Sequence, residues 1–244
     1  MSNDRSKVFL PRNRAQHPPA FAEEYKSSKL RSPQHPLILQ STTVTEESGP
    51  VFGSSFIGPK DDNLIVNYAS GGKTAIGQRI LVHGYLKDQN GRAIPESLVE
   101  IWQANAGGRY RHKNERYLAE LDPNFGGCGR CLTDQSGYYQ FKSILPGAYP
   151  WPNGPNSWRP AHIHFSLFGH SFAQRLITQM YFEGDPLIAD CPIVNAIPDA
   201  AAIQSLVAQL DREATIPMDS LAYRFDITLR GSNQTYFENR REGL

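Results

Sequence analysis

The sequence predicts a mostly β fold, either a sandwich or a barrel. Short segments in which apolar and polar residues alternate recur along the chain, and turn sequences separate them. Glycine and proline account for 20 and 18 of the 244 residues, about 16% together, against roughly 12% in average proteins. All-β sandwiches often reach about 200–250 residues as one unit, so this length fits one domain.

Residues 1–50 are predicted to form an extended arm, and residues 51–244 a single domain. Six prolines interrupt any helix in the arm: Pro11, Pro18, Pro19, Pro33, Pro36 and Pro50. Apolar residues such as Phe9, Phe21 and Tyr25 are too frequent there for a free tail. We therefore expect the arm to pack on its own domain or on another subunit.

The first expected strands form two hairpins. Ile80, Val82 and Leu86 alternate with their neighbours, and an Asn-Gly turn at 90–91 leads to an answering strand at 98–102. An Asp-Gln-Ser-Gly turn at 134–137 is expected to join residues 132–133 to a strand at 138–144.

Three more strands and one helix complete the expected elements. The strands cover 161–168, 174–182 and 221–229, and the last of these alternates clearly. The helix is short, lies in the C-terminal half, and runs from Asp199 to about Leu210. It follows Pro198, and Ile203 and Leu206 have helical spacing.

Charge and hydropathy argue against two classes of partner. The 25 Lys and Arg residues nearly balance the 24 Asp and Glu residues, so we expect no nucleic-acid partner. Mean hydropathy is −0.48, and no apolar run approaches the roughly 18 residues of a membrane helix. The first residues lack the apolar core of a secretory signal. We expect a cytoplasmic protein without a membrane partner.

The three cysteines suggest no disulfide framework. Cys128 and Cys131 form a Cys-x-x-Cys sequence, which indicates either metal or redox chemistry or small residues where a turn meets a strand. A structural zinc site would need a second pair, and the other cysteine, Cys191, is alone. The sequence leaves both interpretations open.

The sharpest local feature is His162 and His164 on a predicted strand. Side chains two residues apart on a strand share a face, so both imidazoles project together while Ile163 and Phe165 point into the opposite layer. Such a pair is suited to binding a metal. The alternative is that both histidines only satisfy neighbouring polar groups.

Two histidines do not complete a metal site. Zinc would need a further His, Cys or carboxylate, ferrous iron would need a carboxylate, and nothing in the spacing selects one. The chain has 11 tyrosines, and each taken alone is more often a core or rim residue. A phenol, with a pKa near 10, binds a metal at neutral pH only if a strong Lewis acid removes its proton. Ferric iron is the ion that best fits this requirement.

Five segments, in this order along the chain, resemble the intradiol ring-cleaving dioxygenases. Within that family the resemblance is to the β subunits of the members that consist of α and β subunits. They are LVEIWQAN at 98–105 with Tyr110 after it, LDPNF at 121–125, TDQSGYYQF at 133–141, PGAYP at 146–150 and WRPAHIHF at 158–165. The resemblance runs over roughly residues 8–240, and the ordered combination is far more specific than any one segment. It implies a β-sandwich core of two mixed sheets with long loops.

The resemblance implies a non-heme Fe(III) cofactor. Its ligands are implied to be Tyr110, Tyr149, His162 and His164, and all four residue types are present. Tyr149 is further implied to be catalytic, because the family releases this tyrosine from the metal when substrate binds.

Other side chains receive roles from the same resemblance. Arg159 is implied to stabilise the negatively charged substrate, and Gln179 to hydrogen-bond nearby. Trp151 and Ile193 are implied to form the pocket wall, and Tyr25 to meet a substrate carboxylate. From the residues alone, Arg159 fits a surface ion pair and Gln179 fits packing equally well.

The function implied is cleavage of protocatechuate (3,4-dihydroxybenzoate) with O2 to 3-carboxy-cis,cis-muconate. The implied partner is a homologous α subunit in an αβ hetero-oligomer, with the active site near the αβ contact. The proline-rich first 50 residues disfavour the catechol branch of the family. The alternatives are action on another catechol (catechol or hydroxyquinol), a non-catalytic β-sandwich binding subunit, and a hydrolytic zinc site.

Overall fold

The computed structural model describes residues 18–33, 35, 54–168 and 175–229. Its strands are β1 (Arg79–Asp88), β2 (Leu98–Gln103), β3 (Cys128–Leu132), β4 (Tyr138–Ile144), β5 (Tyr149–Pro150), β6 (Trp158–Arg159), β7 (His162–Phe168), β8 (Arg175–Phe182), β9 (Val207–Ile216), β10 (Ser220–Arg224) and β11 (Ile227–Leu229). Its helices are α1 (Ser27–Arg31), α3 (Pro192–Asn195) and α4 (Ala200–Gln204), with 3-10 turns η3 (Ser54–Phe56) and η4 (Pro186–Ile188). None of these helices has the length and apolar character that a membrane crossing requires.

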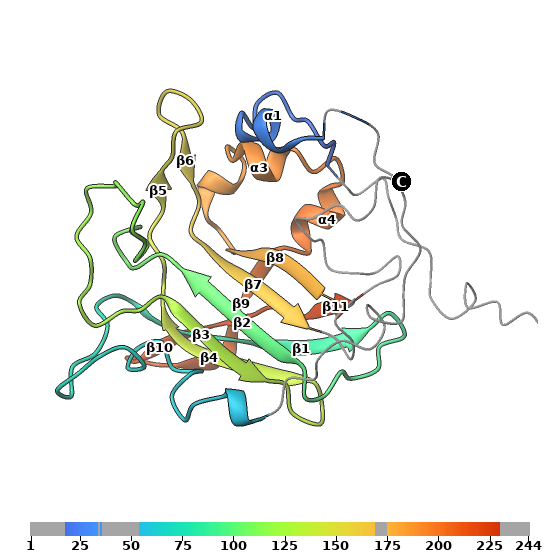
Figure 1. Cartoon of the computed structure of the whole chain (residues 1–244). Coiled ribbons are helices and arrows are strands. Elements are labelled where there is room, and N and C mark those ends of the chain that lie inside the picture. The colour runs from blue at the N-terminus through green and yellow to red at the C-terminus, as the bar shows by residue number, and fades with distance from the viewer. Residues whose placement is uncertain (1–17, 34, 36–53, 169–174, 230–244) are drawn as a thin grey trace, which may run out of the picture.

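The strands form a sandwich whose two layers are joined through β9 (Figure 1). One layer has the order β4-β1-β10-β9, with β11 also on β1, and the other has the order β3-β2-β7-β8-β9. The start of β9 pairs with β8 and the remainder pairs with β10. The pairs β1–β10, β1–β11 and β8–β9 are parallel and the others antiparallel, so both sheets are mixed. The predicted mostly β sandwich is confirmed.

Apolar side chains from alternate strand positions fill the space between the layers. The ring of Phe165 on β7 lies 6.0 Å from that of Tyr139 on β4 and 5.3 Å from that of Phe225. All three residues are buried, as is Ile163. The prediction that Ile163 and Phe165 point away from the histidines and into the core is therefore confirmed.

The first predicted hairpin is wrong in its pairing. The turn forms, since the Gly91 N–H donates to the Asp88 carbonyl at 3.0 Å, and a bridge joins Lys87 to Ala93. However, β1 pairs with β4, β10 and β11, whereas β2 pairs with β3 and β7. The turn sequence determines that the chain reverses, but distant strands with matching apolar faces determine the partners.

The second predicted hairpin is wrong for the same reason. The Gly137 N–H donates to the Asp134 carbonyl at 2.9 Å, so the turn is present. The strands on either side of it then enter different layers, β3 beside β2 and β4 beside β1. A short turn that crosses between sandwich layers has the same local sequence as a hairpin turn.

The predicted helix from Asp199 to about Leu210 is correct only at its start. The Asp199 carboxylate caps α4 by accepting the Ala201 N–H at 2.7 Å, but the helix ends at Gln204. From Val207 the chain is β9, whose backbone pairs with β8 and β10. Backbone pairing with these two strands outweighs the helical spacing of a few apolar residues. The short helices α1 and α3 were not predicted.

The last predicted strand is divided into β10 and β11. Between them the Phe225 N–H donates to the His83 carbonyl at 2.8 Å, and the Asp226 carboxylate accepts the Tyr85 N–H at 3.0 Å. Gly84 makes this approach possible, because a Cβ there would lie 2.1 Å from the Phe225 carbonyl oxygen.

The described part of the arm contains α1 and lies against the loop that follows β5. The Lys26 N–H donates to the Asn153 Oδ1 at 3.0 Å, and the Asn153 Nδ2 donates to the Glu24 carbonyl at 2.8 Å. Most of the arm lies outside the described residues, so the division into arm and domain stays a prediction.

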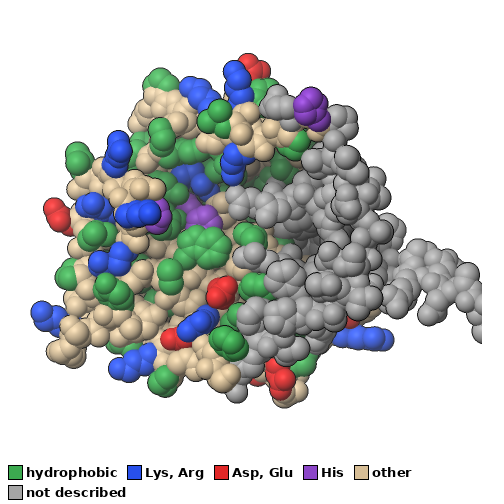
Figure 2. Space-filling view, in the orientation of Figure 1, with side chains coloured by type: hydrophobic (Ala, Val, Ile, Leu, Met, Phe, Trp, Pro, Cys, Tyr) green, Lys and Arg blue, Asp and Glu red, His purple; other side chains and the backbone are tan. Residues whose placement is uncertain are grey.

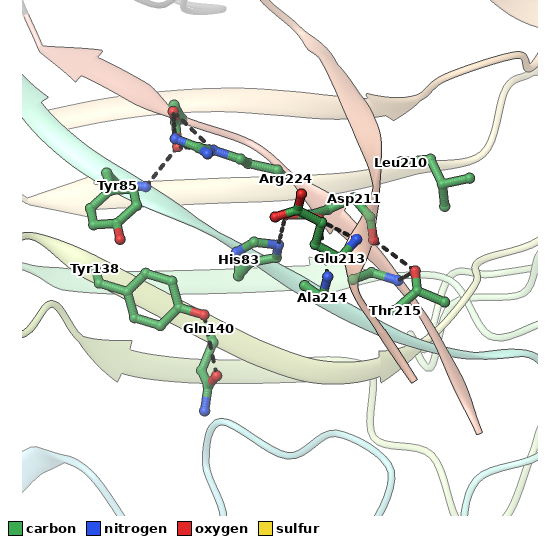
Figure 3. Close-up of polar contacts among 12 residues, drawn as sticks. His83, Tyr85, Tyr138, Gln140, Leu210, Asp211, Glu213, Ala214, Thr215 and Arg224 are labelled. Atoms are coloured by element: carbon green, nitrogen blue, oxygen red, sulfur yellow. Dashed lines mark hydrogen bonds and ion pairs between the residues drawn. The ribbon is translucent and has the colours of Figure 1, made fainter. Parts of the chain in front are cut away.

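Polar side chains gather on the face of β1 that points away from the core (Figure 3). The Nε2 of His83 lies 3.3 Å from a carboxylate oxygen of Asp211 on β9. The Tyr138 ring lies 6.0 Å from the His83 ring, and Arg224 forms an ion pair with Asp226 at 2.8 Å. This group joins β1, β4, β9 and β10 through side chains.

Candidate active site

The two histidines share one face of β7, as predicted. This strand begins at the end of the sandwich where α3 and the β5–β6 pair lie (Figure 1). Ladders with β2 and β8 hold its backbone on both sides, and Trp102 is the partner of His164 on β2. The imidazoles of His162 and His164 therefore project from a rigid support.

Tyr110 lies in the loop after β2, and Asn105 shapes that loop. Its Oδ1 accepts the N–H groups of Gly107 and Arg109, both at 3.0 Å, and its Nδ2 donates to the Glu120 carbonyl at 2.8 Å. The Asn105 side chain is buried. The sequence analysis gave this residue no role, although an Asn two residues before a Gly-Gly pair is a usual signal for such a turn.

The loop of Tyr110 contacts the segment that leads into Tyr149. Gly108 has a φ of +81°, and a Cβ there would lie 2.3 Å from the Ala148 carbonyl oxygen. Tyr149 begins β5, which pairs with β6 so that Tyr149 lies opposite Arg159. Two tyrosines that are far apart in the sequence thus become neighbours because glycine lets the two backbones meet.

The structure brings the four predicted metal ligands into one cluster. The hydroxyl oxygens of Tyr110 and Tyr149 lie 3.3 and 3.4 Å from the His162 Nε2. The ring centroids of His162 and His164 are 5.0 Å apart, and those of the two tyrosines are 5.5 Å apart and nearly perpendicular. Two phenols and two imidazoles face one another.

Contacts on the outer side of each imidazole hold its orientation. The Nδ1 of His162 lies 2.7 Å from the Pro160 carbonyl oxygen. Because a carbonyl only accepts hydrogen bonds, this nitrogen carries the proton and the Nε2 presents its lone pair to the phenols. The indole of Trp102 stacks on His164, with ring centroids 4.7 Å apart and planes 2° from parallel.

Burial controls the protonation of the cluster. It lowers the pKa of His162 well below the ordinary value, with a further contribution from Arg159, and it lowers the pKa of His164 to about 3. It raises the pKa of Tyr110 well above its ordinary value, and it raises the pKa of Tyr149 despite the opposing effect of Arg159. Both imidazoles are therefore neutral, the form that binds metals.

Arg159 is buried beside this cluster, with only 5% of its surface exposed. Its Nη2 donates to the Gln179 Oε1 and, at 3.3 Å, to the Tyr181 hydroxyl, which itself donates to the Gln179 Oε1 at 3.1 Å. Burial acts to lower the pKa of Arg159, but Tyr181 and Tyr149 raise it overall. The surface ion pair considered for Arg159 is wrong, and Gln179 holds the guanidinium rather than only packing.

Tyr181 is the second residue that the sequence analysis did not single out. It is 2% exposed, and its ring centroid lies 6.1 Å from that of His162. Its position two residues after Gln179 on β8 places both side chains on the same face. Figure 2 shows histidine side chains in a recess of this face of the molecule, with Lys and Arg side chains beside them.

The residues predicted for the pocket wall reach the cluster through Arg159 and Tyr181. The guanidinium carbon of Arg159 lies 5.8 Å from the Trp151 ring centroid. The Tyr25 ring lies 5.6 Å from that of Trp151, so the arm contacts the same wall. Ile193 on α3 packs against a small apolar cluster that contains Tyr181.

The Cys-x-x-Cys sequence does not form a thiol pair. Cys128 is exposed, Cys131 is buried, and both are free. They are the first and fourth residues of β3, so their side chains point to opposite faces. Burial raises the pKa of Cys131 to about 12, which keeps this thiol protonated. The interpretation as small residues at the start of a strand agrees with the structure.

Comparison with known proteins finds relatives over nearly the whole chain. A family model described as "Dioxygenase" matches residues 47–231, and one described as "Protocatechuate 3,4-dioxygenase beta subunit N terminal" matches residues 10–41. The chain is 46% identical to the protocatechuate 3,4-dioxygenase beta chain of Burkholderia cepacia over 235 residues, which cover 96% of this chain and 99% of that one.

Two more distant relatives extend the comparison. The protocatechuate 3,4-dioxygenase alpha chain of Pseudomonas putida is 31% identical over 168 residues, covering 67% of this chain and 77% of that one. The structure of catechol 1,2-dioxygenase from Acinetobacter sp. ADP1, inhibited by bound mercury, matches with a TM-score of 0.52 and 26% identity. That match covers 73% of this chain and 62% of the other.

Proposed function

Because this chain belongs to the intradiol dioxygenase family, among the relatives of the protocatechuate 3,4-dioxygenase beta chains, we propose that it is the iron-bearing subunit of such an enzyme. The reaction proposed is cleavage of protocatechuate with O2 to 3-carboxy-cis,cis-muconate. The convergence of Tyr110, Tyr149, His162 and His164 in one buried cluster carries the proposal. The partner proposed is a homologous α subunit, since the chain also resembles an alpha chain.

The donor set fits ferric iron. Two neutral imidazoles and two phenols are present, and the tautomer of His162 directs a lone pair into the cluster. Burial favours the protonated phenols, so only a strongly charged cation would convert them to phenolates. When bound here, ferric iron would supply the Lewis acidity that favours a doubly deprotonated catechol.

The side chains of this protein would bind and polarise the substrate. The Tyr149 Oη, as a phenolate, would accept one catechol proton. The Arg159 guanidinium, held by Gln179 and Tyr181, keeps a positive charge in a buried site where negative charge develops on the ring. Trp151 beside Arg159 would provide an apolar wall for the aromatic ring.

The proposal is tested on the chain co-expressed with its α subunit. We expect bound iron, a wine-red colour from tyrosinate-to-ferric charge transfer, and oxygen uptake with protocatechuate in an oxygen electrode. Tyr110→Phe should weaken and shift the colour, because Tyr149 remains as the other phenolate donor, and it should lose most of the activity. Tyr138→Phe is the matched control, because Tyr138 lies on the opposite part of the sandwich and contacts His83.

Three outcomes would contradict parts of the proposal. Faster turnover of catechol or hydroxyquinol than of protocatechuate would change the substrate. Iron without oxygen uptake on any catechol would favour a non-catalytic binding subunit. A colourless protein that contains zinc in place of iron would refute the ferric site.

A further inference from the structure

Asn153 joins the arm to the loop beside the active site through two hydrogen bonds of opposite polarity. Its Oδ1 accepts the Lys26 N–H at 3.0 Å, and its Nδ2 donates to the Glu24 carbonyl at 2.8 Å. Asn153 as a whole is 6% exposed. The amide thus uses both of its ends on the backbone of a segment more than 120 residues away in the sequence. Few other residue types can do this, since the geometry needs one acceptor and one donor in a plane.

The arm segment held in this way is a compact turn. Ser28 closes it from inside, because its Oγ accepts the Ala22 N–H at 3.0 Å and donates to the Ala22 carbonyl at 2.9 Å. Ser28 is buried, whereas Lys29 and Arg31 on α1 are exposed. The turn therefore has its own internal bonds, and Asn153 supplies two bonds that dock it.

Contacts lead from this docked turn to the cluster. Tyr25 lies between Glu24 and Lys26, the two residues that Asn153 binds, and its ring contacts Trp151 at 5.6 Å. Trp151 in turn lies 5.8 Å from the Arg159 guanidinium. The position of Tyr25 over Trp151 thus depends on the backbone that Asn153 holds.

We propose that Asn153 is a positioning residue that docks the arm turn and so fixes Tyr25 and Trp151 as one wall of the substrate pocket. The proposal rests on the proposed function for the identity of the substrate. If the docked arrangement is the one that binds substrate, loosening it lowers the fraction of competent molecules and raises the apparent Kd by the same factor. Chemistry at the cluster is not changed, because Asn153 contacts neither the imidazoles nor the phenols in the described bonds.

The test compares Asn153→Ala with wild type in the complex with the α subunit. We expect KM for protocatechuate to rise roughly tenfold, since two hydrogen bonds are lost. We expect kcat to stay within about twofold and the iron content to stay unchanged. Limited trypsin digestion, mapped by mass spectrometry, should cut faster after Lys29 and Arg31.

Asn67→Ala is the matched control, because the Asn67 Nδ2 also ties a loop to a distant backbone group, the Cys128 carbonyl at 2.8 Å. It should change neither KM nor cleavage in the arm. A change in KM as large as that of Asn153→Ala would overturn the proposal.

Ser28→Ala provides an arm-side variant that leaves residues 51–244 unaltered, in case Asn153→Ala fails to fold. Like Asn153→Ala, it should raise KM for protocatechuate and accelerate trypsin cleavage in the arm. Faster cleavage without a rise in KM would overturn the positioning role, and so would a fall in kcat with loss of iron. The trypsin pattern does not depend on turnover, so failure of the proposed function would be recognised separately, as wild-type protein without oxygen uptake.

Discussion

Arg159 carries a charge that proteins rarely bury, and three nearby groups explain how it is tolerated. Gln179 and Tyr181 accept its hydrogen bonds, and the ring of Trp151 lies beside the guanidinium. A buried charge is costly unless it is hydrogen-bonded. The hydrogen bonds to Gln179 and Tyr181 therefore offset the cost of burying this cation and hold it in place. The result is a fixed positive charge next to the tyrosines and histidines.

Arg159→Lys tests whether the planar guanidinium matters beyond its charge. Lysine keeps the charge but loses the planar guanidinium, whose Nη2 donates to both Gln179 and Tyr181. We expect kcat to fall about 100-fold, the loss typical when one oriented donor is removed from a reacting centre, with iron content unchanged. Arg130→Lys, the same change at a surface ion pair with Asp61 (2.7 Å), should leave kcat unaltered. Equal rates in the two variants would contradict the role of Arg159.

At the scale of elements, the site depends on how closely two loops approach. Gly108 permits the contact because a Cβ there would lie 2.3 Å from the Ala148 carbonyl oxygen. Gly91 has nearly the same φ, +78° against +81°, but a Cβ on it would meet nothing within 4 Å. An alanine at Gly91 would therefore be destabilising only through its backbone conformation. An alanine at Gly108 would be destabilising through its backbone conformation and also through a clash with Ala148.

Gly91→Ala should lower the free energy of unfolding by about 1–2 kcal/mol and leave activity intact. Gly108→Ala should lower it further and also reduce iron content and oxygen uptake, because the loops that carry Tyr110 and Tyr149 must separate. Chemical denaturation and iron analysis of both variants measure these effects. Full iron content in Gly108→Ala would show that the two loops need not touch.

The polar side chains around His83, which come from β1, β4, β9 and β10, should make the stability of the sandwich depend on pH (Figure 3). Burial lowers the pKa of His83, and Arg224 adds to this, although Asp211 and Asp226 oppose it. Between the two pKa values, His83 is therefore protonated in the unfolded chain and neutral in the folded chain. The contribution of His83 is fully present above about pH 6.5, the ordinary histidine value, and is lost as the pH falls toward the lower folded pKa.

His83→Gln should weaken this pH dependence. Between pH 7.5 and pH 5.5, we expect the Tm of the variant to fall less than the Tm of the wild type, as measured by calorimetry. Comparing the two proteins cancels the contributions of the other histidines. If both Tm curves fall in parallel, His83 does not contribute to the acid sensitivity.

At the scale of the whole molecule, Phe165 connects the chemistry to the core. It lies between His164 and the rest of β7, and its ring contacts Tyr139 and Phe225 from the facing layer. Phe165→Ala should lower the free energy of unfolding by about 3–5 kcal/mol, because a fully buried ring leaves a cavity between the layers. Leu118→Ala, at a side chain that is 90% exposed, should change it by about 0.5 kcal/mol or less. Denaturant unfolding measures both, and similar losses would show that the layers do not depend on this ring.

The site as a whole draws on segments that are widely separated along the chain. The arm supplies Tyr25, the loop after β2 supplies Tyr110, β5 supplies Tyr149, and β7 and β8 supply the histidines and Gln179. Only the closed sandwich brings these segments to one end. A substitution that loosens the core should therefore also displace the loops that carry the side chains of the site.

The sequence by itself determined what depends on near neighbours. Alternation predicted the strands and the shared face of His162 and His164, the turn residues predicted each reversal, and the ordered motifs indicated the family. These properties follow from interactions within a few residues, where backbone geometry leaves few choices.

The tertiary structure decided which strands pair, where the helix after Asp199 ends, and that Arg159 is buried. It also revealed Asn105, Asn153 and Tyr181, whose partners lie in other segments. Each of these outcomes depends on which contacts between residues distant in the chain are the most favourable. The energies of those contacts depend on distances and burial that arise only when the layers close.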